Sequence, residues 1–300
     1  MNRSRFAQAC GTHGLKAVNF SIFQRGAMRT TFRISLLAIG LASLLVASAA
    51  SAGSALVEFP NLPGQKPTSL AGYLALPDSG LSAELPAVVV LHGCDGISGH
   101  YIGIADQLRS WGYVALAVDS FGPRGIPNRC GGEGEAQAFD AYAALRYLSQ
   151  LDFVNPARVA VLGESLGGYA ALYAVDRDLA ARNVAERFRA AIVYYPTCGI
   201  PAASMTAPTL ILIGEADEWS PVEQCRAMVA RARPDGAPIA LTVYPGVHHN
   251  FDVAKLVHGV RYLGYWLEYN GPAAKDAEEK TRAFLAIHLA GTAPGQPTAK

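Results

Sequence analysis

The sequence predicts an α/β fold, with a mostly parallel, doubly wound sheet that carries helices on both faces. Short apolar runs alternate with helical stretches from residue 70 to residue 289. Two of these runs, residues 88–91 and 210–213, are hydrophobic at every position. Strands that are apolar on both faces lie inside parallel sheets that helices cover on each side. Their alternation with helices indicates a doubly wound topology.

Each apolar run predicts one strand, and the stretches between the runs predict the helices. Strands are expected at residues 70–76, 87–92, 113–119, 158–163, 190–195, 209–214 and 240–244. Helices are expected at residues 101–111, 134–151, 166–175, 221–233 and 275–289. In doubly wound sheets ligands bind beyond the carboxyl ends of the strands. Candidate functional residues should therefore directly follow the apolar runs.

Residues 1–52 have the composition of a leader. They contain six basic residues and no acidic one, and an uncharged Leu- and Ala-rich run at 34–50 ends in Ala50-Ser51-Ala52. A basic start, a short apolar middle and an A-x-A ending are the parts of a secretory signal peptide. The compact basic segment that begins at Met28 makes this the expected start, with cleavage after Ala52 and a periplasmic or secreted product. A membrane anchor is the alternative, but the run is shorter than the roughly 20 residues that a spanning helix needs.

Residues 53–300 are expected to form a single, mildly acidic domain. Without the six basic residues of the leader, 19 basic residues stand against 24 acidic ones, a net charge of −5. No basic stripe of the kind that binds nucleic acid remains, and no Lys-rich amphipathic stretch suggests a membrane surface. We therefore expect a small-molecule substrate, no nucleic-acid partner, no stable membrane span after cleavage and no cofactor.

Four cysteines follow the leader, at Cys94, Cys130, Cys198 and Cys225. An even number in an oxidising compartment indicates disulfides. Of the three possible pairings we favour Cys94–Cys130 and Cys198–Cys225, because each pair comes from segments expected above neighbouring strand ends. Four free thiols are the alternative. No C-x-x-C or His-paired spacing supports zinc, so no metal is expected.

The strongest motif lies between the strand expected at 158–163 and the helix expected at 166–175. It reads Gly163-Glu164-Ser165-Leu166-Gly167. G-x-S-x-G in this context places a serine on a strained strand-to-helix turn, where its hydroxyl stands clear of the sheet as a nucleophile. A glycine-rich turn with an incidental serine is the alternative. We predict that Ser165 is the nucleophile of an α/β-hydrolase fold.

A serine needs a base, and in this fold the order is serine, acid, histidine. Four histidines follow Ser165, namely His248, His249, His258 and His288. Only His248 and His249 directly follow the last expected strand. Neighbouring side chains diverge, so only one of the two can face the serine, and we select His249. His258 and His288 are expected to have surface or packing roles.

The acid should follow an intervening strand. Asp217 lies where the loop after residues 209–214 leaves the sheet, which suits a carboxylate that fixes the tautomer of the histidine. Glu215 and Glu218 compete for the role, and Asp252 is too close to His249 in the sequence.

Part of an oxyanion hole is expected after the strand at 87–92. His92-Gly93-Cys94 forms a histidine–glycine turn, and such a turn supplies one backbone N–H of an oxyanion hole. We assign the two donors to Cys94 and Leu166. His92 precedes the serine and is therefore not expected to be the base.

These segments together resemble the dienelactone hydrolase family over residues 55–290. The resemblance rests on Leu91-His-Gly-Cys-Asp-Gly96, Val118-Asp-Ser-Phe-Gly-Pro-Arg-Gly125, Gly163-Glu-Ser-Leu-Gly-Gly168, Gly214-Glu-Ala-Asp217 and Tyr244-Pro-Gly-Val-His-His-Asn-Phe251. It implies that the nucleophile, acid and base fall on Ser165, Asp217 and His249. The enzymes that give the family its name use cysteine as nucleophile and open an unsaturated lactone in the cytoplasm. A serine in an exported chain favours general ester hydrolysis.

Three residues are candidate substrate contacts: His92, Arg124 and Glu164. Arg124 with Asp119 could meet a substrate carboxylate, or the two could form a structural loop pair. The expected activity is hydrolysis of small carboxylic esters or lactones through an acyl-enzyme. Peptidase or acyltransferase activity, and a non-catalytic binding protein of the same fold, are the alternatives.

Overall fold

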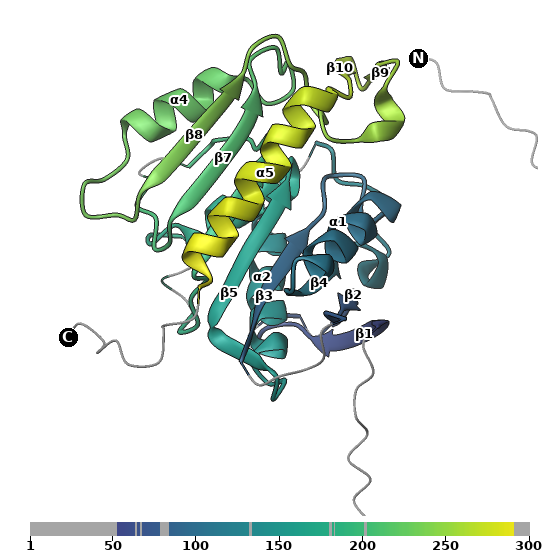
Figure 1. Cartoon of the computed structure of the whole chain (residues 1–300), viewed down its shortest axis with the longest axis vertical. Helices are drawn as coiled ribbons and strands as arrows, with labels where there is room; N and C mark the ends of the chain where they lie inside the picture. Colours follow the sequence, from purple (N-terminus) through teal and green to yellow (C-terminus); the bar gives the residue numbers. More distant parts are fainter. Residues whose placement is uncertain are drawn as a thin grey trace, which may run out of the picture. The chain divides into compact units, whose positions relative to one another are not determined.

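A central sheet of eight strands organises the structure, a computed structural model that describes residues 53–290 except 64, 67, 79–83, 132–133, 180–181, 183 and 201–202. These residues lie within one compact unit, Ala49–Lys300. The expected signal peptide and its start at Met28 fall outside the described residues. The described sheet has the strand order β1-β2-β4-β3-β5-β6-β7-β8 (Figure 1).

The strands are β1 (Ser54–Pro60), β2 (Ser69–Ala75), β3 (Leu85–Leu91), β4 (Val114–Asp119), β5 (Val154–Glu164), β6 (Ala190–Tyr194), β7 (Thr209–Gly214) and β8 (Ile239–Tyr244). β1 pairs antiparallel with β2, and β2 antiparallel with β4. All the other neighbours in this sheet pair in parallel. Every residue of β6 and of β7 is buried, because both faces of these central strands are covered.

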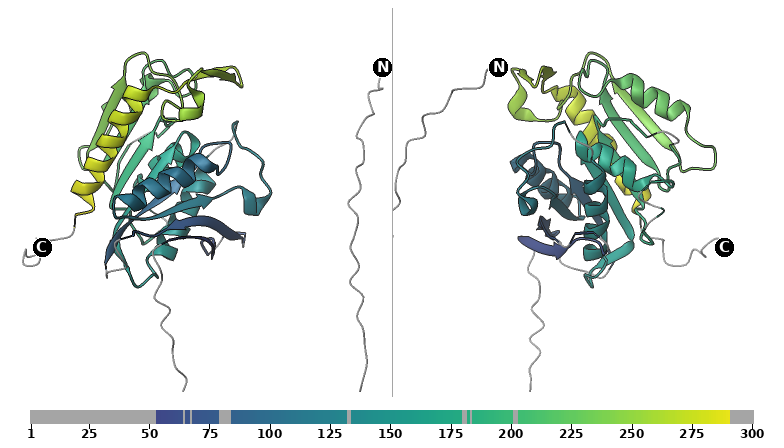
Figure 2. Two further views of the ribbon diagram at one scale, coloured as in Figure 1. Left: turned by 45° about the vertical axis from the view of Figure 1, so that its right-hand side comes forward. Right: turned by 180° about the vertical axis from the view of Figure 1, so that it is seen from behind.

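The helices are α1 (Gly99–Ser110), α2 (Glu135–Leu148), α3 (Leu166–Val175), α4 (Val222–Ala230) and α5 (Gly271–His288). Figure 1 shows α1 and α5 on the near face of the sheet and α2 behind it, and the reverse view in Figure 2 brings the opposite layer forward. α2 packs against α3 on that layer. The predicted α/β-hydrolase architecture, a mostly parallel sheet between two helix layers, is confirmed.

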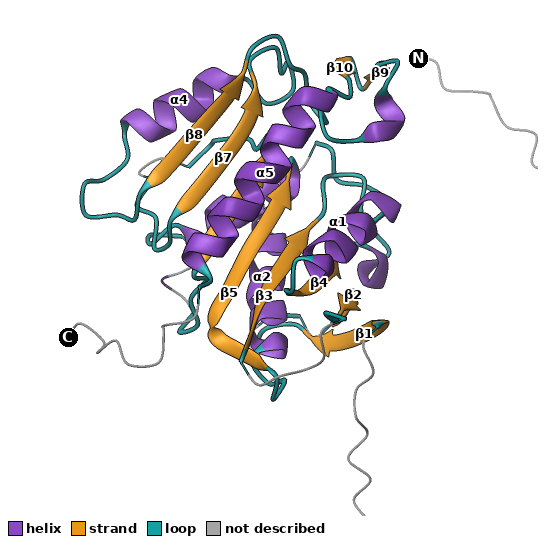
Figure 3. Cartoon of the chain, in the orientation of Figure 1, coloured by secondary structure: helices purple, strands orange, loops and turns teal. Residues whose placement is uncertain are grey.

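Three strands were not expected from the sequence. In β1 only Phe59 is buried and Leu56 is 86% exposed, and this edge strand lacks the long continuous apolar sequence of an interior strand. β9 (Val260–Tyr262) and β10 (Tyr265–Leu267) form a separate hairpin of three-residue strands (Figure 3). Such short strands hold too few residues for a periodic signal.

Helix α5 begins four residues before the expected Lys275. The side chain of Asn270 accepts a hydrogen bond from the backbone N–H of Ala273, and Pro272 lies in the first turn. Asn as N-cap and Pro at the first helical positions are start signals. Among the described residues, no helix is long and apolar enough to cross a bilayer.

Candidate active site

Ser165 lies on the tight turn between the end of β5 and the start of α3. Its backbone has φ 52° and ψ −116°, a region that residues with a Cβ rarely occupy. A Cβ at Gly163 would lie 2.1 Å from the carbonyl oxygen of Gly167, and one at Gly167 would lie 2.4 Å from that of Leu91. Both glycines are therefore required for the turn that lifts the serine hydroxyl above the sheet.

We predict that Gly167→Ala destabilises the fold, because its new methyl group would collide with backbone atoms that cannot rotate away. The expected cost is about 1–3 kcal/mol, measured by urea unfolding. Gly103→Ala is the matched control, because Gly103 lies inside α1 and no atom lies within 4 Å of the place that its new methyl group would take. There the better helix propensity of alanine should stabilise by about 0.5–1 kcal/mol. Equal effects at both positions would contradict the steric explanation.

Three side chains from separate segments meet at the carboxyl end of the sheet. The Nδ1 atom of His249 lies 2.7 Å from Oδ2 of Asp217, and its Nε2 atom lies 3.0 Å from Oγ of Ser165. Asp217 follows β7 and His249 follows β8, and both are buried. Since an ionised carboxylate only accepts hydrogen bonds, Nδ1 donates and Nε2 is left to accept the serine proton.

The second oxygen of Asp217 is fixed by the backbone. Its Oδ1 atom accepts hydrogen bonds from the N–H groups of Trp219, at 2.9 Å, and Ser220, at 2.7 Å. The carboxylate therefore cannot rotate without losing these two bonds. This arrangement leaves Oδ2 directed at His249.

The competing acids and histidines lie elsewhere. The side chains of Glu215 and Glu218 are exposed. His248 turns its Nδ1 atom to a backbone carbonyl at 2.9 Å. His258 is exposed, and His288 ends α5. None of these five side chains makes a hydrogen bond with Ser165 or His249 in the described part of the chain.

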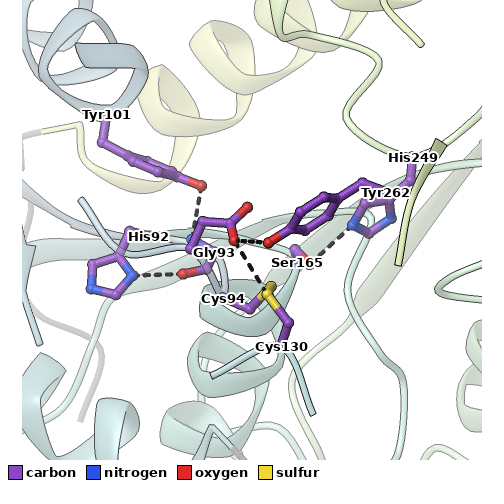
Figure 4. Close-up of a disulfide and its surroundings, with 9 residues drawn as sticks. His92, Gly93, Cys94, Tyr101, Cys130, Ser165, His249 and Tyr262 are labelled. Carbon is purple, nitrogen blue, oxygen red and sulfur yellow. Dashed lines mark hydrogen bonds between the residues drawn. A yellow bond between two sulfur atoms is a disulfide. The ribbon is translucent and has the colours of Figure 1, made fainter. Parts of the chain in front are cut away.

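The turn after β3 lies against the serine. A Cβ at Gly93 would be 3.6 Å from the Cβ of Ser165, and the N–H of Gly93 donates to the hydroxyl of Tyr101 at 2.8 Å. The disulfide Cys94–Cys130 closes over this turn (Figure 4). Cys94 and Leu166 have no hydrogen-bond acceptor for their backbone N–H among the described residues. For Leu166 this follows from its place in the first turn of α3.

A cleft of about 260 Å³ opens beside Ser165 and His249. Trp219 stacks on His249 with ring centroids 5.3 Å apart, and Tyr265 stacks on the indole at 4.8 Å. Tyr262 lines the cleft and donates its hydroxyl to Asp95 at 2.8 Å. Trp219, from the loop after β7, thus covers the histidine, and Tyr265 of the β9–β10 hairpin backs the indole.

Comparison with known proteins agrees with this geometry. A sequence profile of the dienelactone hydrolase family matches residues 70–289. The chain belongs to the dienelactone hydrolase family. It is 28% identical over 245 residues to a Bradyrhizobium protein named "Probable 2-oxo-3-(5-oxofuran-2-ylidene)propanoate lactonase", with 76% of this chain and 93% of that protein covered.

Solved structures show the same fold. A dienelactone hydrolase-like promiscuous phosphotriesterase from metagenomic libraries superimposes with a TM-score of 0.64 at 20% identity, over 79% of this chain and 99% of that one. A propionate-bound esterase from Thermogutta terrifontis gives a TM-score of 0.60 at 20% identity, over 80% and 97%. As a member of the dienelactone hydrolase family, the protein is a hydrolase that acts on ester bonds.

The expected disulfides are both present in this member of the dienelactone hydrolase family. Cys94 is joined to Cys130, and Cys198 to Cys225. Among the described residues, two groups of side chains place potential metal-ligand atoms within 4.8 Å of one another. The first is Cys94, Asp95 and Cys130, but its two sulfur atoms are bonded to each other in the disulfide. The other group is His100, Glu164 and Asp252, and its members contact one another through hydrogen bonds and ion pairs.

The expectation that His92 contacts substrate is not supported. His92 is buried and absent from the lining of the cleft. Its Nε2 atom accepts from the N–H of Ser120 at 3.2 Å, so Nδ1 donates to the carbonyl of Gly93 at 2.7 Å. Gln137 donates to the carbonyl of His92 at 2.8 Å. Burial lowers the pKa of His92, and this neutral ring braces the turn that holds Cys94.

The candidate contact of Arg124 with a substrate carboxylate is corrected in the same way. The guanidinium makes a bidentate ion pair with Asp140, at 2.6 and 2.7 Å, and does not line the cleft. Asp119 is not its partner, because Oδ1 of Asp119 accepts the backbone N–H groups of Phe121 and Gly122. Arg124 is occupied by the fully buried carboxylate of Asp140.

We predict that Arg124→Ala destabilises the protein without changing the KM for a neutral or anionic ester. An unpaired charge would remain buried at Asp140, at a cost of about 3–5 kcal/mol in unfolding free energy. Replacing both charges, Arg124→Met with Asp140→Leu, should cost much less because no charge stays unpaired. A raised KM for carboxylate-bearing esters, with stability retained, would restore the original interpretation.

Glu164 also faces away from the cleft. Its carboxylate, 1% exposed, contacts Nε2 of His100 at 2.9 and 3.1 Å and the hydroxyl of Tyr195 at 3.0 Å. Burial raises the pKa of Glu164, but the charge and the hydrogen bond of His100 outweigh it and lower the pKa. Sequence reasoning missed His100 and Tyr195, which belong to no motif. The signal was Glu164 itself, since a carboxylate at the end of a buried strand requires a partner.

Proposed function

We propose that this protein hydrolyses small carboxylic esters or lactones through an acyl-enzyme on Ser165. The observation that carries the proposal is the position of His249, hydrogen-bonded to Asp217 on one side and to Ser165 on the other. In the first step Nε2 of His249 takes the hydroxyl proton while Oγ bonds to the carbonyl carbon. The carbonyl oxygen becomes an oxyanion, and the backbone N–H groups of Leu166 and Cys94 are the proposed donors to it.

The intermediate collapses when the C–O bond of the alcohol breaks and the imidazolium returns its proton to the leaving oxygen. Water then attacks the acyl carbon, with His249 as base again, and releases the acid. Asp217 stays ionised throughout and stabilises the imidazolium. For a lactone the alcohol oxygen stays in the same molecule as the acyl group, so water releases a single hydroxy acid.

A short acyl group fits the cleft best. Its volume of about 260 Å³ lies just below the roughly 300–1,000 Å³ that is usual for ligand pockets. The names of the compared proteins, a lactonase and an esterase with bound propionate, are in keeping with a small substrate.

The test is a substrate panel with the purified protein. We expect hydrolysis of p-nitrophenyl acetate and butyrate to exceed that of the octanoate, a butenolide lactone to be opened, and a peptide anilide to remain intact. A fluorophosphonate probe should label one peptide, the one that contains Ser165. Absence of both ester hydrolysis and labelling would favour a non-catalytic binding protein instead, and anilide cleavage would favour a peptidase.

We further propose that the enzyme is exported. Two disulfides, one of them on the turn beside Ser165, support a product that matures in an oxidising compartment. Expression of the whole chain followed by cell fractionation should place esterase activity in the periplasm or medium, with Gly53 as the new first residue. Activity that stays cytoplasmic with the leader attached would contradict export.

A further inference from the structure

A chain of hydrogen bonds, buried at Glu164 and Tyr195 and half-buried at His100 and Asp252, lies next to the proposed catalytic residues. Tyr195, the residue after β6, places its hydroxyl 3.0 Å from Oε2 of Glu164 and 2.7 Å from Oδ1 of Asp252. His100, from α1, contacts Glu164 at 2.9 Å and Asp252 at 3.6 Å. The side chains of four residues that are distant in sequence, two of them carboxylic acids, therefore contact one another.

Counting protons assigns a charge to each member of this chain. A tyrosine hydroxyl has one proton, so it can donate to only one of two carboxyl groups. The second contact is a hydrogen bond only if that carboxyl group is protonated and donates to the tyrosine oxygen. His100 lies closer to Glu164, so Glu164 is the ionised member and Asp252 the neutral acid. The neutral Asp252 and the hydroxyl of Tyr195 thus supply one proton each to the contacts that join them to Glu164.

The pKa shifts of these groups agree with an ionised Glu164 and a neutral Asp252. Burial and the charge of Glu164 raise the pKa of Asp252 well above its usual range. Burial lowers the pKa of His100, but the charge and hydrogen bond of Glu164 outweigh it and raise the pKa to about 9. Lys255, Tyr101 and Tyr194 are the other titratable groups that act on the cluster. At neutral pH the cluster holds one cation and one anion.

The chain joins the two loops whose separation fixes the distance between base and nucleophile. Glu164 immediately precedes Ser165, and Asp252 is three residues after His249. The ring of Tyr195 lies 4.6 Å from that of His249, and the amide of Asn250 reaches the tyrosine hydroxyl at 3.4 Å. Asn250 has φ 57°, in the left-handed region that asparagine adopts more readily than most residues with a Cβ.

We infer that Asp252 is a positioning residue, which acts as a neutral acid through Tyr195 and Glu164 to hold His249 in register with Ser165. The inference rests on the proposed function, because it concerns the efficiency of that same site. Asp252 does not touch the reacting atoms. Its loss should lower kcat and the rate of Ser165 labelling while leaving KM nearly unchanged.

The experiment compares Asp252→Asn with Asp252→Ala in the full-length protein. Asparagine keeps a neutral donor of the same shape, so D252N should retain kcat within about threefold of wild type. D252A removes the link, and the displaced base should lower kcat by up to about 100-fold. Circular dichroism at the assay temperature selects conditions in which each variant is folded. Glu278→Gln, an exposed carboxylate on α5, is the control and should change nothing.

Tyr195→Phe tests whether the effect travels through the hydroxyl. Y195F should lower kcat as D252A does, and the double variant should be no worse than either single one, since both break the same chain. Additive losses would overturn the inference, as would a D252N variant as impaired as D252A. If the wild type is active and kcat is unchanged in D252A, the inference about Asp252 is overturned while the proposed function stands. An inactive wild type would overturn it together with the proposed function.

Discussion

Ser165→Ala is expected to lower kcat for p-nitrophenyl acetate by about a million-fold, the scale seen when a triad serine is removed. In the part of the chain that the structure describes, Ser165 carries the only hydroxyl that is hydrogen-bonded to His249, so no substitute nucleophile is in place. Fluorophosphonate labelling should disappear in the same variant. Stability should be retained, since the strained turn keeps both of its glycines.

Ser110→Ala is the matched control for this variant. Ser110 is an exposed serine at the end of α1, where its hydroxyl bonds only a backbone carbonyl of the same helix. It should leave kcat and labelling unchanged. Labelling that persists in Ser165→Ala at the wild-type rate would show that another residue is the nucleophile.

The sequence was sufficient to predict the architecture because the apolar runs of the strands and the helical stretches between them are both local signals. Continuous apolar runs identified the interior strands, and the predicted bounds of β7 and α3 agree with the structure. β1 and the β9–β10 hairpin were missed because their stability comes from pairing and from isolated contacts such as Phe59. An alternation of apolar and polar residues can be recognised only when a strand buries several residues on one face, and these strands bury too few.

The residues of the candidate site also fall into those that local sequence could predict and those that it could not. Ser165, Asp217 and His249 were named because each directly follows a predicted strand, and chain order limits the choice. Arg124 and Glu164 were misplaced because the sequence shows a charge but not its partner. Asp140 lies inside an apolar helix face and His100 at the start of another helix. Only the folded chain shows that Arg124 pairs with Asp140 and that Glu164 pairs with His100. Of these four residues, His100 alone lines the cleft.

Asp217→Asn carries the second large expectation, a loss of about 10⁴-fold in kcat. Two backbone N–H groups point at the Oδ1 position, so the amide oxygen of asparagine must occupy it. The amide NH₂ then faces Nδ1 of His249 at the 2.7 Å position. Because that group donates, Nδ1 must accept and the ring proton moves to Nε2. An Nε2–H cannot accept the proton of Ser165, so the base is held in the wrong tautomer.

The same geometry predicts that Asp217→Asn keeps its fold, because both backbone bonds and the shape of the side chain are preserved. Its Tm should stay close to that of wild type while Ser165 labelling slows in parallel with kcat. Glu215→Gln, two residues away and exposed, is the control and should leave both unaffected. A D217N variant that retains more than about a tenth of wild-type kcat would mean that the tautomer of His249 is set elsewhere. In that case the hydrogen bond to Asp217 would orient the ring without deciding which nitrogen takes the proton.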